Sequence, residues 1–259
     1  MIKSIGFIGS GNVAGNISVK LLKQRFDIKF VYSKTKKNQK RLATKLNCLT
    51  LDSLDDIPLV DLIFICVNDD QIESVSNKLA IQNNTMVIHC SGSVNREILK
   101  KNKNNGVFYP FQSFNKNEEV NWGNVPILVE ASNEENEKKL TQLAQRLSSK
   151  VEIADSNQRR VLHLSGVLIN NFTNHLAVLS KEILVQNNLN PNLLNSLTRQ
   201  TADNILSGNP ELFQTGPAVR LDLNTINSHL ELLKENENLK IIYRQLTQSI
   251  QLWNAKKDL

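Results

Sequence analysis

Short apolar runs alternate with amphipathic segments along the first 154 residues of the chain. The runs are rich in β-branched residues and too short for helices, so they predict buried strands, whereas apolar residues at helical spacing predict helices. Alternation of the two favours an α/β fold with a doubly wound parallel sheet. The expected strands are residues 2–8, 28–32, 59–67, 85–89, 107–109, 127–129 and 151–153, and the expected helices are residues 12–23, 36–46, 71–79 and 132–147.

From residue 155 onward the pattern is helical throughout. Asp155 or Ser156 is expected to cap a long helix that reaches about residue 187. Asn190-Pro191 begins another helix, because proline suits the first helical turn, and two more are expected near residues 224–233 and 238–253. The change of pattern predicts two domains, an α/β domain of residues 1–154 and an all-helical domain of residues 155–259.

A glycine-rich segment joins the first expected strand to the first expected helix. Its spacing is G-x-G-x-x-A, which is typical of a dinucleotide-binding Rossmann turn. The first glycine permits the tight turn, the second lets the backbone approach a pyrophosphate, and the small third residue lets helix and strand pack closely. The segment that we expect to bind the dinucleotide is Gly9, Ser10, Gly11, Asn12, Val13 and Ala14.

The end of the second expected strand indicates which dinucleotide binds. An acidic residue there would hold the ribose hydroxyl of NAD, but the chain has Ser33 and Lys34 at this point. A hydroxyl and a cation suit the 2′-phosphate of NADP, to which they can make charge-assisted hydrogen bonds. The alternative is that these residues form only a polar turn.

Polar residues follow three more expected strands, and the carboxyl ends of parallel strands face the ligand. Val67, Asn68, Asp69 and Ser91 are expected to line the cofactor, His89 to act in catalysis, and Tyr109 and Gln112 to bind substrate. Asp69 and Asp70 are adjacent, which favours helix capping over a catalytic pair. Cys90 has no evident base nearby and is expected to be a packed, unreactive thiol.

Composition narrows the class of protein further. The net charge of +6 and the pI near 9.2 are compatible with nucleic-acid binding. However, aromatic residues make up only 5% of the chain and do not alternate with a basic stripe, which argues against it. The three cysteines lack metal-site spacing and suit a reducing cytoplasm. The longest apolar stretch contains Asp61, so it cannot span a membrane. We therefore expect no nucleic acid, metal or membrane partner and a cytoplasmic location.

Several motifs together resemble a known family. The glycine segment, Val67-Asn68-Asp69 and residues 89–92 resemble the first half of pyrroline-5-carboxylate reductases and of NADP oxidoreductases described as coenzyme-F420-dependent. Residues 89–93, 109–114 and 215–222 and His163 resemble, over nearly the whole chain, a Rossmann-like family with a helical C-terminal domain of unknown function. The resemblance implies an NADP-dependent oxidoreductase with a C-terminal domain like that of 6-phosphogluconate dehydrogenase.

The expected long helix carries the second group of candidate site residues. His163 and Asn170 are seven positions apart and therefore share one helical face, on which Gly166 leaves room for another group. We expect His163 to donate a proton or orient the substrate and Asn170 to hold its polar group. Arg220 either pairs with Asp222 to shape a loop or binds an anionic substrate.

These features predict an enzyme that uses NADP to move a hydride to or from a small C=O or C=N substrate bound between the two domains. The alternatives are an NADP sensor without turnover and an assembly subunit. The last two expected helices carry more apolar residues than one small domain is expected to bury: Leu230, Leu233, Ile241, Ile242, Leu246, Ile250 and Trp253. We therefore expect a homodimer formed through the C-terminal helices.

Overall fold

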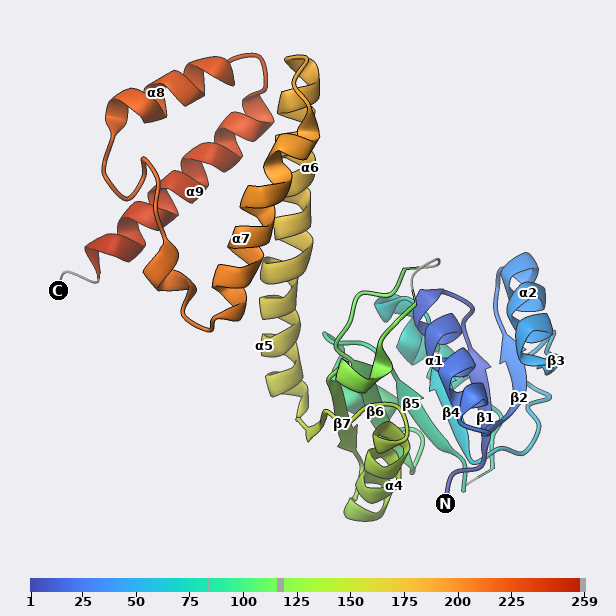
Figure 1. The fold of residues 1–259 in the computed structure, drawn as a ribbon. Helices are drawn as coiled ribbons and strands as arrows, with labels where there is room; N and C mark the ends of the chain where they lie inside the picture. The colour runs from blue at the N-terminus through green and yellow to red at the C-terminus, as the bar shows by residue number, and fades with distance from the viewer. Residues whose placement is uncertain (83, 116–118, 257–259) are drawn as a thin grey trace. The chain divides into compact units, whose positions relative to one another are not determined.

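The computed structural model describes residues 1–82, 84–115 and 119–256. It divides into two compact units, Met1–Asn170 and Asn171–Leu259, which we call the first and second units (Figure 1). The sheet ends before Ser156, close to the predicted domain boundary, but the units divide later, inside the helical segment that follows. The assignment of domains to residues 1–154 and 155–259 therefore stays a prediction.

The first unit is built on one eight-stranded sheet with the order β3-β2-β1-β4-β5-β6-β7-β8. This order contains the Rossmann arrangement, in which strands are added toward one edge of the sheet from β1 to β3 and toward the other edge from β4 onward. It confirms the predicted fold class. The strands are β1 (Ser4–Ile8), β2 (Asp27–Tyr32), β3 (Leu49–Thr50), β4 (Leu62–Ile65), β5 (Met86–His89), β6 (Asn105–Pro110), β7 (Ile127–Ala131) and β8 (Val151–Ile153).

The sheet departs from a fully parallel arrangement at one pair. β6 and β7 are antiparallel, whereas the other neighbouring pairs are parallel. A parallel connection needs a crossover, usually a helix. The described part of the β6–β7 connection contains only the 3₁₀ turn η3 (Trp122–Asn124), so the chain returns alongside β6 in the opposite direction. Strand β3 was not predicted, because two residues carry no periodic signal.

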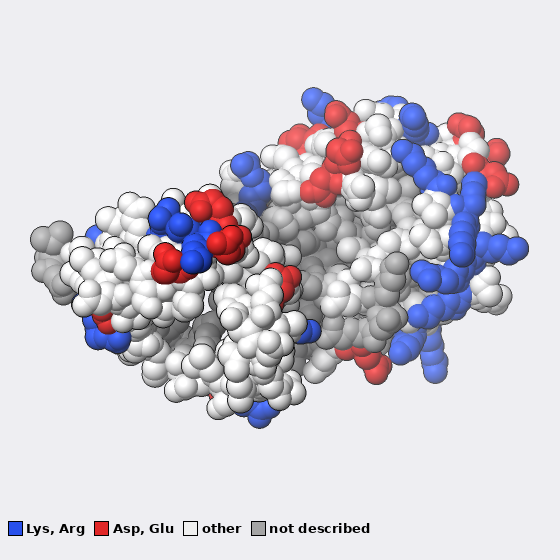
Figure 2. All heavy atoms as spheres, turned by 90° about the horizontal axis from the view of Figure 1, so that it is seen from above, with Lys and Arg blue, Asp and Glu red and all other residues white. Residues whose placement is uncertain are grey.

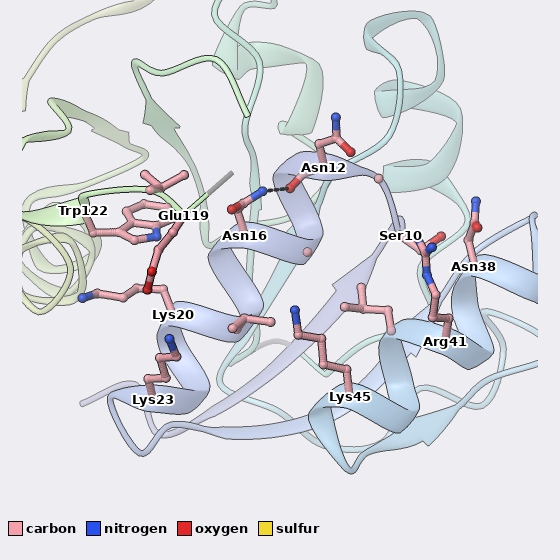
Figure 3. A pocket seen from close by; sticks show the side chains of 15 residues that line it. Ser10, Asn12, Asn16, Lys20, Lys23, Asn38, Arg41, Lys45, Glu119 and Trp122 are labelled. Carbon is pink, nitrogen blue, oxygen red and sulfur yellow. Dashed lines mark hydrogen bonds between the residues drawn. The ribbon is translucent and has the colours of Figure 1, made fainter. Parts of the chain in front are cut away.

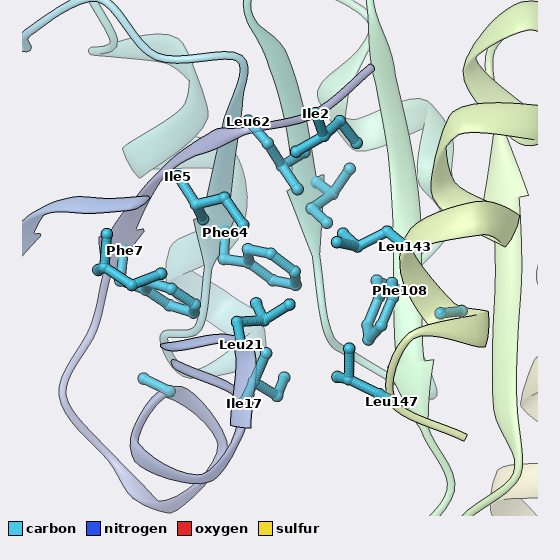
Figure 4. Packing of buried hydrophobic residues seen from close by; sticks show 14 of the residues in the cluster. Ile2, Ile5, Phe7, Ile17, Leu21, Leu62, Phe64, Phe108, Leu143 and Leu147 are labelled. Atoms are coloured by element: carbon cyan, nitrogen blue, oxygen red, sulfur yellow. The ribbon is translucent and has the colours of Figure 1, made fainter. Parts of the chain in front are cut away.

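Helices cover both faces of the sheet and bury two cores. On one face, α1 and α4 pack with α2 against side chains such as Phe7 and Phe64 (Figure 4). On the other face, α3 and the 3₁₀ turn η2 cover Ile63 and Ile65. These elements are α1 (Asn12–Lys23), α2 (Lys36–Leu46), η1 (Asp69–Gln71), α3 (Ile72–Asn77), η2 (Arg96–Leu99) and α4 (Glu134–Gln145).

The predicted long helix contains a change of helical type. It begins as α5 (Ser156–Gly166), for which Asp155 and Gln158 form a reciprocal capping box. It continues as a π-helix, η4 (Val167–Phe172), and then as α6 (Thr173–Gln186). Such π segments occur frequently at functional sites, and this one contains Asn170.

The second unit is helical, as predicted. After α6 come η5 (Pro191–Leu194), α7 (Asn195–Leu206), η6 (Pro210–Phe213), α8 (Leu223–Leu232) and α9 (Glu237–Ala255). Its buried hydrophobic residues in the described part of the chain are few: Leu179, Ala218, Ile226 and Leu239. Among the described residues, no helix combines the length and the apolar character needed to cross a membrane.

Candidate functional site

The glycine-rich turn has the geometry that a dinucleotide-binding turn requires. Gly9 has a φ of 115°, and a Cβ added there would lie 2.1 Å from the carbonyl oxygen of Cys66. Only glycine fits both conditions. A Cβ at Gly11 would meet no atom within 4 Å, so this side of the turn is open. Ala14 is fully buried, which is consistent with its predicted role in close helix packing.

Side chains of the turn connect it to two neighbouring loops. Ser10 donates a hydrogen bond of 2.8 Å from its hydroxyl to that of Ser33, just after β2. The Nδ2 atom of Asn12 donates to the carbonyl oxygen of Phe114 at 2.8 Å, just after β6. No side chain caps the N-terminus of α1. Its free N–H groups and positive dipole end therefore suit phosphate groups.

The loop after β4 contains Val67, Asn68 and Asp69. The carboxylate of Asp69 accepts a hydrogen bond of 2.5 Å from the hydroxyl of Ser93, which belongs to the loop after β5. The prediction that Asp69 or Asp70 caps the next helix was wrong. Helix α3 begins later, after an N-cap Gln71 that makes no side-chain bond, and the two aspartates lie in the 3₁₀ turn before it.

His89 ends β5 and is fully buried. Its Nδ1 accepts a hydrogen bond of 3.1 Å from the backbone N–H of Ser91. Burial, and then the positive charge of Arg159, lower the pKa of His89 from 6.5 to about 3. The ring is therefore neutral at physiological pH. This environment favours a role in holding the loop after β5 over the predicted role in catalysis.

Arg159 on α5 is the site residue that the sequence interpretation missed. Its side chain is fully buried. The guanidinium donates to the carbonyl oxygens of Ser91 at 3.2 Å and Val94 at 2.6 Å and forms an ion pair of 2.5 Å with Glu130 on β7. It thus joins α5 to the loop after β5. Its position one helical turn before His163 places it near the same helical face, but Arg160 has an equivalent spacing, so the sequence alone does not single it out.

Tyr109 on β6 and His163 on α5 form the central pair of the site. The tyrosine hydroxyl lies 3.0 Å from Nδ1 of His163, and the two rings meet edge to face. Burial raises the pKa of Tyr109, so its phenol is protonated at neutral pH. Gly92 lies against this pair, because a Cβ added to it would come within 2.6 Å of the histidine Nδ1. The sequence predicted both residues but not their contact.

Asn170 and Gln112 are exposed in the first unit. The side-chain amide of Asn170 donates a hydrogen bond of 2.6 Å to the hydroxyl of Ser113. The space that was predicted at Gly166 is filled by Phe111, since a Cβ at Gly166 would lie 2.6 Å from that ring. The π segment and the loop after β6 therefore contact each other beside the Tyr109–His163 pair.

Arg220 lies in the second unit and forms no ion pair with Asp222. Asp222 instead caps α8, where its carboxylate accepts hydrogen bonds from the backbone N–H and the hydroxyl of Thr225. These bonds, with a smaller contribution from the charge of Arg220, lower the pKa of Asp222. The loop-shaping role therefore belongs to Asp222 and Thr225.

Two cysteines lie at adjacent strand ends. The sulfur atoms of Cys66 and Cys90 are 3.7 Å apart, and both thiols are free. Burial, together with the neighbouring Cys66, raises the pKa of Cys90 well above its usual value. A thiol that ionises so reluctantly is a poor nucleophile, as expected from the sequence.

Comparison with known proteins agrees with this geometry. Residues 4–93 match the family described as "NADP oxidoreductase coenzyme F420-dependent", and residues 125–250 match a domain of unknown function, DUF2520. A "putative NADP oxidoreductase" from Bacteroides fragilis is 32% identical, over 96% of this chain and 98% of that chain, with a TM-score of 0.88. No curated protein sequence matches the chain.

The Rossmann strand order, the glycine turn and these matches define an NADP-dependent oxidoreductase. The chain belongs to the family in which an NADP oxidoreductase domain of the coenzyme-F420-dependent type precedes a DUF2520 domain. The resemblance and the NADP cofactor inferred from the sequence are thereby confirmed.

Two distant structures share the fold. A reductive aminase from Aspergillus terreus, in complex with NADPH and ethyl-5-oxohexanoate, is 13% identical over 96% of this chain and 95% of that chain, with a TM-score of 0.68. A pyrroline-5-carboxylate reductase from Coxiella burnetii is 18% identical over 99% of this chain and 98% of that chain, with a TM-score of 0.56. At these identities the likeness concerns the fold alone.

Proposed function

We propose that the protein reduces a small C=O or C=N substrate with NADPH. In this proposal, His163 donates the proton that the substrate needs and Tyr109 positions His163. The observation that supports this most directly is the hydrogen bond of 3.0 Å between the Tyr109 hydroxyl and Nδ1 of His163. Tyr109 belongs to β6 and His163 to α5, and the pair lies against Gly92 in the loop after β5. Ligands of such sheets bind at the carboxyl ends of the strands.

The residues of the first unit fit the cofactor. The open side of Gly11 and the uncapped N-terminus of α1 suit its pyrophosphate. Ser10, Ser33, Val67, Asn68, Asp69 and Ser91 come from the neighbouring strand ends and would line the rest of it. When bound, NADPH supplies the hydride.

The protein must then supply a proton to the oxygen or nitrogen of the substrate. We assign this step to His163, because histidine is the side chain that most often transfers a proton in catalysis and its ring is held by Tyr109. The Tyr109 hydroxyl can donate to Nδ1 of a neutral imidazole and can accept from Nδ1–H of an imidazolium. The contact therefore orients the ring in both protonation states, and Tyr109 acts as a positioning residue.

The remaining predicted residues would contact the substrate. Asn170 and Gln112 are exposed in the first unit, and Asn170 is oriented by Ser113. Arg220 lies in the second unit without an ion pair among the described residues, which leaves its guanidinium available to an anionic substrate. The reductive aminase and the pyrroline-5-carboxylate reductase of the same fold support the choice of a C=O or C=N group.

The test is NADPH oxidation by the purified protein with a panel of small ketones and cyclic imines, followed by absorbance of the reduced nicotinamide and by product mass. With an accepted substrate, His163→Ala should lower turnover by about 100-fold or more, the scale of losing a general acid, and leave NADPH affinity unchanged. His175→Ala is the matched control in the second unit. Turnover within about threefold of the parent in His163→Ala would refute the assignment.

We also propose that two copies associate through the second unit. Exposed large hydrophobic residues are frequent on its helices and include Leu197, Leu206, Ile241, Leu246 and Trp253. Soluble monomers rarely expose large contiguous apolar patches, so exposed apolar residues in this number favour a partner surface. A second copy of the chain would cover it, with two-fold symmetry as the usual arrangement.

The cellular location that we propose is the cytoplasm. Cys48, Cys66 and Cys90 are all free thiols. Unpaired cysteines, two of them with sulfur atoms only 3.7 Å apart, suit a reducing compartment.

A further inference from the structure

A groove of about 700 Å³ opens beside the glycine-rich turn and runs between α1 and α2 (Figure 3). Ser10, Gly11 and Asn12 line one end of it, which makes it continuous with the expected pyrophosphate site. Asn38 and Arg41 of α2 lie beside Ser10 at this end of the groove, whereas Glu119 and Trp122 lie near Lys20 at the other.

The wall formed by α1 leaves room for a ligand. Gly11 and Gly15 are four residues apart and share one face of the helix. A Cβ added to either would meet no atom within 4 Å. The hydroxyl of Ser10, which lines this end of the groove, is held by a hydrogen bond of 2.8 Å to the hydroxyl of Ser33. Hydroxyl and amide groups therefore gather around an open volume next to α2.

Lys34 and Arg41 are the two candidate cations for binding the 2′-phosphate of NADP. The Nζ atom of Lys34 lies 3.3 Å from the side-chain oxygen of Gln71, and Lys34 does not line the groove. Arg41 does line it and forms no ion pair with any residue that the structure describes. Figure 2 shows a stripe of Lys and Arg side chains over the α2 end of the first unit.

We propose that Arg41, with Asn38 one turn before it on α2, binds the 2′-phosphate of NADP and sets the preference for NADP over NAD. The planar guanidinium matches a phosphate in bidentate fashion, and lysine lacks this geometry. Asn38 contributes an amide donor, and Ser10, whose hydroxyl is hydrogen-bonded to that of Ser33, lines the same groove. Lys34, the cation that the sequence pattern favoured, then contributes less.

This inference rests on the cofactor and not on the proposed reaction. The test is therefore calorimetric titration of the full-length protein with NADPH and with NADH, which needs no substrate. The variants are Arg41→Gln, Arg41→Lys, Lys34→Gln and Lys45→Gln. Lys45 lines the same groove and carries the same charge, so its variant measures the general electrostatic effect.

We expect Arg41→Gln to raise the Kd for NADPH by about 10- to 100-fold, the scale of losing a hydrogen bond to a charged group. Its Kd for NADH should change by less than about threefold. Arg41→Lys should recover only part of the NADPH affinity, and Lys34→Gln should differ from Lys45→Gln by less than about threefold.

Three outcomes would overturn the proposal. One is that the parent binds NADPH and NADH equally. Another is that Arg41→Gln weakens both cofactors to the same extent, which would place its contact elsewhere on the dinucleotide. The third is that Lys34→Gln, and not Arg41→Gln, removes the preference. If none of these results is found but the protein shows no turnover, the proposed reaction is contradicted and the role of Arg41 in cofactor binding is not.

Discussion

Gly92 and His163 are in such close contact that no larger residue fits at position 92. An added Cβ would lie 2.6 Å from Nδ1 of His163 and 2.8 Å from the hydroxyl oxygen of Tyr109. The loop after β5 therefore determines where the Tyr109–His163 pair lies. Any side chain at position 92 would have to displace one of the two rings.

We expect Gly92→Ala to lower the free energy of unfolding by about 1–3 kcal/mol, the usual cost of overpacking. Turnover should fall as well, because the hydrogen bond of Tyr109 would be lost. Gly123→Ala is the control, since a Cβ there meets only the side-chain oxygen of Asn121 at 3.6 Å. Urea denaturation measures the difference, and equal midpoints for the two variants would contradict the contact.

His89 should make the protein sensitive to acid. Its folded-state pKa of about 3 lies below the ordinary value of 6.5, so the unfolded chain takes up a proton first as the pH falls. Stability from the neutral ring is fully present above about pH 6.5 and is lost progressively toward pH 3. The loss is on the order of 4–5 kcal/mol. Denaturation midpoints of His89→Gln across this range should fall less steeply than those of the parent.

Arg159 should be among the least replaceable charged residues. Arg159→Met removes donors from the carbonyls of Ser91 and Val94 and leaves Glu130 paired with Arg96 alone, at 3.4 Å. Breaking a buried ion pair outright costs about 3–5 kcal/mol, and because Arg96 remains we expect a loss of about 2–4 kcal/mol. The exposed neighbour Arg160 provides the control, and Arg160→Met should change the unfolding midpoint little. Comparable destabilisation by both variants would refute the role of Arg159.

Light scattering at micromolar concentration should give twice the chain mass of 29.2 kDa. Leu246 on α9 is 45% exposed in the single chain, so Leu246→Arg should weaken the dimer by placing a charge in the apolar contact. Gln248→Arg on the same helix is the control. A mass of 29.2 kDa for the parent would exclude a stable dimer at that concentration.

Much of the fold could be predicted because it depends on local pattern. Helices α1 and α2 have the predicted bounds, since apolar residues at helical spacing mark the face that packs on the sheet. Strand β8 also has its predicted bounds. The direction of β7 could not be predicted, because it depends on how the chain returns after β6 and not on the composition of the strand.

The same division holds for the site. The spacing of Gly9, Gly11 and Ala14 was enough to predict the cofactor turn, because backbone conformation and close packing allow only small residues there. The partner of Tyr109 was not predictable, since His163 is 54 residues away and meets it only when α5 packs beside the loop after β5. Arg159 and Arg160 look equivalent in the sequence, yet one is fully buried and the other exposed. They differ because Arg159 lies on the side of α5 that faces the first unit and Arg160 does not, and which side of a helix is buried is decided only when the chain folds.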